Sequence, residues 1–181
     1  MRARQVLSDW NDANSRKNRC GVTGNSVVVN SANHLQTVAT QGAVTAQIRW
    51  KKPQQGRLKF NVDAAFSEAL NCVGFGVCIR DAAGNFIRAK TMWSNPVCSS
   101  DVGEALGLLY AIQWMHELQH TDVDFELDAK KVVDYFNRGS NDVSEFGAIM
   151  DACRRIHNSY FENSKVEFRR RQANEVAHTR T

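Results

Sequence analysis

The stretch Lys59-Phe60-Asn61-Val62-Asp63-Ala64-Ala65-Phe66 decides the fold of this chain. Apolar Leu58, Phe60 and Val62 alternate with polar side chains, which predicts a strand over about residues 57–65. The alternation ends at Asp63. A carboxylate on a central strand is costly unless it is paired or holds a cation, so Asp63 is the first candidate site residue.

Two further acids occupy comparable positions downstream. Glu104 lies near the start of a long amphipathic helix, and Asp128 ends a second strand, Val123-Asp124-Phe125-Glu126-Leu127. We group Asp63, Glu104 and Asp128 as one cluster and predict that it binds divalent metal. The pattern alone leaves an alternative, three unrelated solvated acids. In that case Glu104 would simply suit the positive end of the helix dipole in the first helical turn.

The turns and the hydrophobic periodicity place the other elements. Strands are predicted at residues 73–80 and 85–93, joined by the turn Asp81-Ala82-Ala83-Gly84, so the first three strands form an antiparallel meander. Gly74 and Gly76 suggest a close backbone approach or a bulge in the second strand. Lys52-Pro53 marks a linker before the first strand.

The helices are predicted from N-cap residues and from spacing. Ser99, Ser100 and Asp101 are all capable N-caps for a helix whose buried face would hold Val102, Ala105, Leu109, Ile112 and Met115. A helix after Asp128 stops near Gly139, and Ser144 with Gly147 begins the next one. A fifth strand at residues 165–170 and a final helix from Asn174 complete an α/β fold with a mixed sheet and helices on its faces.

Five segments, taken in order, resemble a ribonuclease H-type domain (type 1), in the subtype found in plant retrotransposon-derived reverse transcriptase proteins. The resemblance covers roughly residues 50–181 and implies the ribonuclease H-like fold with a five-stranded mixed sheet. The segments are Trp50-Lys51-Lys52-Pro53 with Gly56 and residues 59–66, Gly74 to Asp81 with Gly84, Glu104-Ala105-Leu106 with Ala111, Phe125 to Asp128 with Val132-Val133, and Phe168 to His178.

The resemblance implies a ribonuclease that cleaves the RNA strand of RNA–DNA hybrids with two divalent ions, Mg²⁺ or Mn²⁺. Asp63 would be the bridging ligand, Glu104 would reach in from the first helix, and Asp128 from the neighbouring strand. Two such ions can activate an in-line water and stabilise the leaving oxygen. Hard cations of this kind prefer carboxylate oxygens.

The fourth ligand position departs from the family pattern. Where the family has an Asp three residues after the Asn-Glu pair, Asn174-Glu175 is followed here by His178. Neutral imidazole can bind metal but brings no negative charge and favours softer ions than Mg²⁺. We therefore expect weaker Mg²⁺ use, better Mn²⁺ use, and loss of activity below about pH 6.5 as His178 protonates. The alternative is that His178 is only a surface or packing residue.

Three more departures bear on catalysis. The loop before the final helix is contracted to Arg171-Gln172-Ala173, and no His lies between Lys165 and Val176 to replace the family's catalytic one. Ala64 replaces the Gly that often follows the first Asp, and the final helix looks truncated at the end of the sequence. These features favour a second hypothesis, a catalytically weak or inactive nucleic-acid-binding remnant of a retrotransposon. A third is an interaction domain that uses the fold alone.

Candidate nucleic-acid contacts are basic. Arg169, Arg170 and Arg171 end the last strand and Lys130 follows Asp128, so these side chains could bind phosphates and make binding salt-dependent. The alternative is a solvated charge run. Hybrid recognition would depend on 2′-hydroxyls and groove shape. The four Trp, at positions 10, 50, 93 and 114, form no interleaved aromatic–basic patch, so no stacking platform is predicted.

Composition divides the chain into a leader and a domain. Residues 1–60 carry ten basic and two acidic residues, a net charge of +8, whereas residues 61–181 carry −4. The basic half indicates an anionic partner or simply a solvated tail. Residues 1–49 are rich in Asn, Ser, Thr and Gln, and we expect a disordered or weakly structured leader followed by one domain over residues 50–181.

The cysteines and the hydropathy indicate a compartment. Five Cys with no Cys-x-x-Cys pair indicate neither a disulfide framework nor a zinc site, and Cys72, Cys78 and Cys153 read as small core residues. No signal peptide and no membrane span is evident. We expect a protein of the nucleus or cytosol that is not secreted, does not use a membrane and needs no obligate protein partner.

Overall fold

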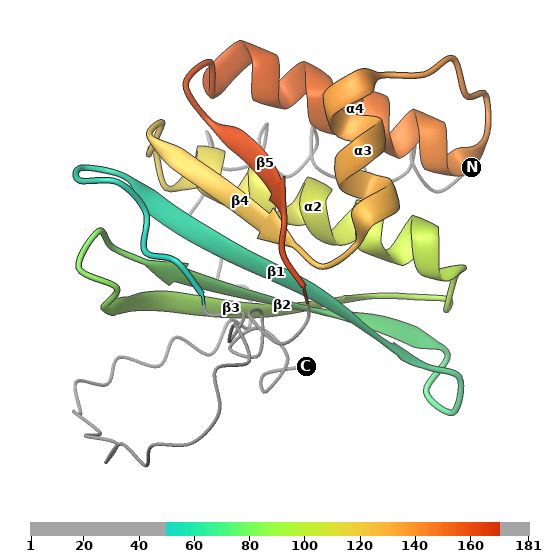
Figure 1. Cartoon of the computed structure of the whole chain (residues 1–181). Coiled ribbons are helices and arrows are strands. Elements are labelled where there is room, and N and C mark those ends of the chain that lie inside the picture. Colours follow the sequence, from blue (N-terminus) through green and yellow to red (C-terminus); the bar gives the residue numbers. More distant parts are fainter. Residues whose placement is uncertain (1–49, 171–181) are drawn as a thin grey trace, which may run out of the picture.

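The computed structural model describes residues 50–170, which form five strands and three helices (Figure 1). Within this range, none of the helices has the length and hydropathy of a membrane-spanning segment. In chain order the elements are β1 (Leu58–Ser67), β2 (Cys72–Arg80), β3 (Phe86–Ser94), α2 (Ser100–Glu117), β4 (Val123–Leu127), α3 (Lys130–Arg138), α4 (Glu145–Tyr160) and β5 (Lys165–Phe168).

The strands form one mixed sheet in the order β3-β2-β1-β4-β5. The pairs β1–β2 and β2–β3 are antiparallel, which confirms the predicted meander. The pairs β1–β4 and β4–β5 are parallel. β1 therefore lies at the centre of the sheet, between an antiparallel and a parallel neighbour. This position agrees with the burial of residues on both of its faces.

The hydrophobic core lies between one face of the sheet and the helices α2 and α4. Phe60 on β1 contacts Phe125 on β4 and Trp114 on α2, with ring centroids 5.5 and 5.9 Å apart. The predicted buried face of α2 is confirmed, because all five of its residues are buried. α2 is also buried on its other sides, since it is enclosed by the sheet and α4, and the Cys153 Sγ atom lies 3.8 Å from the Ala105 carbonyl.

Two glycines one helical turn apart face the sheet from α2, and the first of them lets the helix approach closely. A Cβ atom added to Gly103 would lie 2.4 Å from the Phe66 ring, and one added to Gly107 would lie 3.4 Å from Val62. The first distance is shorter than any real contact, whereas the second is an ordinary one. The N-terminal half of α2, which carries Glu104, therefore lies close against β1.

The strands differ from their predicted limits in two places. β1 continues to Ser67, four residues past Asp63, because it pairs with β2 along its whole length. β5 stops at Phe168 because its partner β4 ends at Leu127, although the Arg169 amide still donates to the Leu127 carbonyl at 2.8 Å. The bulge suggested for Gly74 and Gly76 is wrong: the pairing is continuous there and shifts between Ile79 and Arg80.

The helix ends agree with the sequence except at α2. Ser144 accepts a hydrogen bond from the Gly147 amide at 3.3 Å and caps α4. α3 ends before Gly139, whose φ of +71° suits glycine. The N-cap of α2 is Ser99, which makes no side-chain capping bond, and Asp101 is the acid in its first turn. Glu104 therefore lies beyond the first turn, and the prediction that placed it there is wrong.

The cysteines that the structure describes are free. Cys78 and Cys153 are buried, as predicted, and burial raises the pKa of the Cys153 thiol. Cys72 is only half-buried, because it stands at the first position of β2.

Candidate active site

Three carboxylates lie close together, one on β1, one on α2 and one on the residue that follows β4. Asp63, Glu104 and Asp128 each offer an oxygen atom, and these atoms all lie within 4.8 Å of one another. Asp63 is buried, with 2% of its surface exposed, while Glu104 and Asp128 are half-buried. The structure thus brings together the three acids that the sequence grouped, and they are not unrelated in space.

The strand register explains why Asp63 and Asp128 are neighbours. The last parallel pair between β1 and β4 is Val62 with Leu127. One residue further along the two strands come Asp63 and Asp128, which are therefore neighbours. At this point β4 ends and the chain turns toward α3 (Figure 1). Because β4 stops there, Asp63 has a strand neighbour only on the β2 side, where it is paired with Gly76.

Glu104 completes the cluster from α2. The favourable interaction of an acid with the helix dipole fades beyond the first turn, so the position of Glu104 is not explained by the dipole. Two like charges 4.8 Å apart repel each other by about 3.5 kcal/mol at an effective dielectric constant near 20. A bound cation would offset this repulsion, and three carboxylate oxygens are the donor set that Mg²⁺ and Mn²⁺ prefer.

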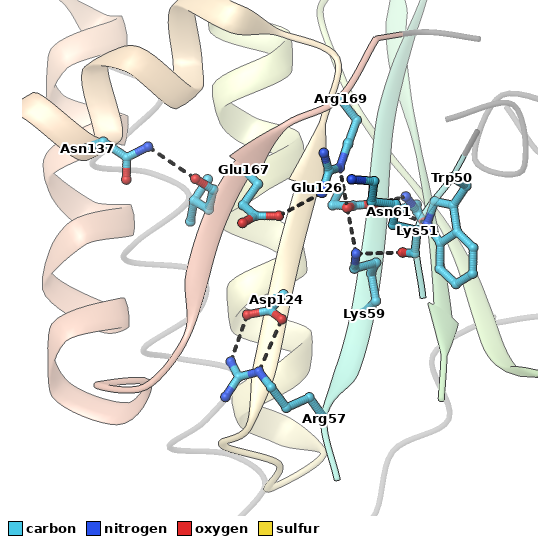
Figure 2. Close-up of polar contacts among 11 residues, drawn as sticks. Trp50, Lys51, Arg57, Lys59, Asn61, Asp124, Glu126, Asn137, Glu167 and Arg169 are labelled. Carbon is cyan, nitrogen blue, oxygen red and sulfur yellow. Dashed lines mark hydrogen bonds and ion pairs between the residues drawn. The ribbon is translucent and has the colours of Figure 1, made fainter. Parts of the chain in front are cut away.

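A second polar centre lies on the same strands, two residues before the acids. Glu126 on β4 is fully buried, and its carboxylate has four partners, two at each oxygen (Figure 2): three donate hydrogen bonds, and Lys59 forms an ion pair. The four partners and their distances are Lys59 Nζ (2.8 Å) and Arg169 Nε (2.6 Å) to Oε1, and Asn61 Nδ2 (3.0 Å) and Trp50 Nε1 (3.0 Å) to Oε2. We call these five residues the Glu126 network.

The Glu126 network connects four parts of the chain. It joins the segment before β1, β1 itself, β4 and the end of β5. Lys59 also donates to the Lys51 carbonyl at 2.8 Å, and the cations of Lys59 and Arg80 lie over the Trp50 ring, 5.5 and 5.4 Å from its centroid. Residues 50–53 have no secondary structure, as expected of a linker, but Trp50 is bound to the sheet and Pro53 is buried.

The row of ion pairs continues toward the start of the strands. Arg57 binds Asp124 through Nε and Nη2, at 3.1 and 2.7 Å (Figure 2). The hydrogen bond to Asp124 raises the pKa of Arg57. Asp124 and Glu126 alternate with the apolar residues of β4, so their side chains occupy the sheet face opposite to the core. This pairing keeps the buried carboxylates neutralised next to the acidic cluster.

The predicted nucleic-acid contacts have different surroundings. Arg169 is held by Glu126 and Glu167, and the bond to Glu126 raises its pKa. Lys130 pairs with Asp134 at 2.6 Å on the exposed side of α3. Arg170 is exposed, whereas Arg171 and His178 lie outside the described residues. Contact of these residues with nucleic acid stays a prediction. Arg169 would have to bind a phosphate while it keeps its ion pairs with Glu126 and Glu167.

Sequence reasoning missed Trp50, Asn61 and Glu126. A signal for two of them was present, since Asn61 precedes Asp63 by two residues and Glu126 precedes Asp128 by two. In a parallel pair with Asp63 beside Asp128, these two residues must also be neighbours on the same face. The position of Trp50 depends on a segment without secondary structure, and periodicity carries no information about it.

The comparisons with known proteins agree on the fold. A family model described as reverse transcriptase-like matches residues 61–180. Among curated proteins, no sequence matches significantly. Ribonuclease H1 from Halobacterium salinarum NRC-1 has a similar structure, with a TM-score of 0.60 at 16% identity over 68% of this chain and 93% of that one.

Two further solved structures extend the comparison. LC11-RNase H1, isolated from compost by metagenomics and solved in complex with an RNA/DNA hybrid, has a TM-score of 0.60 at 16% identity, over 68% of this chain and 92% of that one. The protease–reverse transcriptase of prototype foamy virus has a TM-score of 0.58 at 10% identity, over 76% of this chain and 22% of that one. These likenesses establish a ribonuclease H-like fold. The chain belongs to the reverse transcriptase-like family.

Proposed function

We propose that this protein is a metal-dependent ribonuclease that cleaves the RNA strand of RNA–DNA hybrids. The observation that carries the proposal is the meeting of Asp63, Glu104 and Asp128 within 4.8 Å in a ribonuclease H-like fold. The family match and the solved relatives support the class of substrate, because one of them is a ribonuclease H1 bound to an RNA/DNA hybrid.

The chain's own residues supply a rigid cradle of negative charge. Asp63 lies on the central strand, which is paired on both sides up to the preceding residue, so its carboxylate has little freedom. Glu104 is fixed by the close approach of α2, and Asp128 by the end of β4. Two Mg²⁺ or Mn²⁺ ions held by these acids would supply an activated water and stabilisation of the leaving oxygen.

Other parts of the proposal come from the sequence alone. His178 would be the fourth ligand, and Arg170, Arg171 and Lys130 would contact phosphates. The plant retrotransposon-derived subtype and a location in the nucleus or cytosol also belong to the proposal. Recognition of the hybrid would depend on groove shape and on 2′-hydroxyls, as is usual for proteins that bind RNA helices.

Cleavage of an end-labelled RNA–DNA hybrid by the purified chain, in Mg²⁺ and separately in Mn²⁺, tests the proposal. We expect cleavage of the RNA strand only, and its loss in Asp63→Asn and Asp128→Asn. Glu162→Gln is the matched control, because it removes an exposed carboxylate away from the cluster. It should cleave like the wild type.

One result would favour the second candidate function, a nucleic-acid-binding remnant without activity. This candidate is supported by His178 in place of an acid and by the contracted loop Arg171-Gln172-Ala173. A folded protein that binds the hybrid in both metals but cleaves neither strand would establish it and would refute the enzyme.

A further inference from the structure

We propose that Trp93 forms a second substrate contact, in which its indole packs against the apolar face of a nucleotide close to the scissile phosphate. The inference deepens the proposed function and rests on it. Trp93 on β3 has 67% of its surface exposed, a large value for a residue type that is highly buried on average. Trp114, in contrast, is buried in the core.

The strand register places Trp93 on the face of the sheet that carries Asp63. Asp63 is paired with Gly76, and Gly76 with Thr91. Two residues further along, Ala65 is paired with Gly74, and Gly74 with Trp93. Directly paired residues of antiparallel strands point to the same side, and so do residues two apart on one strand. Trp93 and Asp63 therefore share a face.

The two side chains are close, and β2 puts no side chain between them, although the Gly76 backbone itself is buried. Neighbouring strands are about 4.8 Å apart, and a strand rises about 3.4 Å per residue. Trp93 lies two strand spacings across the sheet from Asp63 and two residues along it, so their Cα atoms are about 12 Å apart. The residues of β2 on this path are Gly74 and Gly76, which have no side chains. A Cβ atom added to Gly74 would meet no atom closer than 4.0 Å.

This geometry suits a nucleic-acid strand that passes over the acidic cluster. A distance of about 12 Å corresponds to roughly four base-pair steps of axial rise, so a hybrid with its scissile phosphate at Asp63 reaches Trp93. An indole offers a flat apolar surface for a sugar or an unpaired base, and its N–H can donate to a phosphate or a 2′-hydroxyl. The exposed Thr91 between them adds a hydroxyl on the same side.

The test measures hybrid binding apart from cleavage, by fluorescence anisotropy in Ca²⁺. Two labelled substrates are used, a blunt hybrid and one with a single-stranded extension, so that contact with a paired sugar and stacking on an unpaired base are distinguished. Loss of one aromatic–base contact weakens binding by about 5- to 150-fold. We expect at least the lower value for Trp93→Ala with one of the two substrates, and near wild-type binding for Trp93→Phe.

The control variant is Tyr160→Ala, an exposed aromatic residue at the end of α4. It should bind both substrates like the wild type. Equal affinity of Trp93→Ala and wild type for both substrates would overturn the inference and leave the proposed function intact. A change of oligomeric state in Trp93→Ala without a change in hybrid affinity would also overturn it, in favour of a protein interface. A wild type that binds no hybrid would refute the proposed function together with the inference.

Discussion

Replacing Glu126 by Gln should destabilise the fold more than any other removal of a single charge on the sheet. All four groups around the Glu126 carboxylate are donors. A Gln side chain has only one oxygen, and its NH₂ group would face two donors. Lys59, whose side chain is 4% exposed, would keep the Lys51 carbonyl and the Trp50 ring but lose its counter-ion in the described part of the chain, which leaves a buried charge without a negative partner there.

The expected loss follows from this buried charge. Removal of one partner of a buried ion pair costs about 3–5 kcal/mol, and we expect the lower part of this range, about 3 kcal/mol, because Arg169 keeps Glu167. For a domain of this size that corresponds to a fall in Tm on the order of 10 °C. Thermal unfolding and urea unfolding, each followed by circular dichroism, measure the change.

Two variants test the reasoning behind this value. Glu167→Gln removes the other acid that binds Arg169, and the Glu167 side chain is 38% exposed. The free energy of unfolding should therefore change by less than about 1 kcal/mol. Lys59→Met combined with Glu126→Gln removes the stranded cation and should be more stable than Glu126→Gln alone. Equal losses in Glu126→Gln and Glu167→Gln would refute the idea that burial of Lys59 and Glu126 sets the magnitude.

Three further predictions follow from single residues. Gly107→Ala should raise the free energy of unfolding by up to about 1 kcal/mol, because Ala is the better helix former and its Cβ makes ordinary contacts at 3.4 Å; a loss of stability in urea would contradict this. Burial lowers the pKa of His157, which packs against Phe136 with ring centroids 5.0 Å apart. The unfolded chain therefore binds a proton more readily than the folded one, so the contribution of His157 is complete above about pH 6.5 and is lost as the pH falls below that value. Thermal melts between acid and neutral pH should show this loss in the wild type, and the same slope in His157→Phe would exclude His157 as its source. His178→Asp should raise cleavage in Mg²⁺ relative to Mn²⁺, and an unchanged ratio of the two rates would show that His178 is no ligand.

The sheet and most of its limits could be predicted from the sequence because alternation reports burial directly. Phe60, Val62 and Phe125 alternate with polar residues and lie in the core as expected. The pairing of Asp63 with Asp128 needed one more fact, that β4 lies parallel to β1 in a given register. The family resemblance implied only that Asp128 lies on a neighbouring strand, and residue spacing alone left open that the three acids are unrelated.

The Glu126 network could not be predicted because its energy depends on partners far away in the chain. Trp50 is 76 residues from Glu126, Asn61 is 65 and Arg169 is 43. A buried acid is unfavourable in isolation, and only the assembled sheet shows that it has four donors. The position of Trp93 on the same face as Asp63 could not be predicted for a similar reason, because it depends on the register of three strands.

Calorimetric titration with Mn²⁺ and with Mg²⁺ tests the central claim, that Asp63, Glu104 and Asp128 form a divalent-metal site. We expect the wild type to bind Mn²⁺ and, more weakly, Mg²⁺. Asp63→Asn should lose this binding, yet be more stable than the wild type without metal, because it relieves the repulsion between like charges. Equal metal binding by the wild type and Asp63→Asn, or no binding by either, would contradict the account.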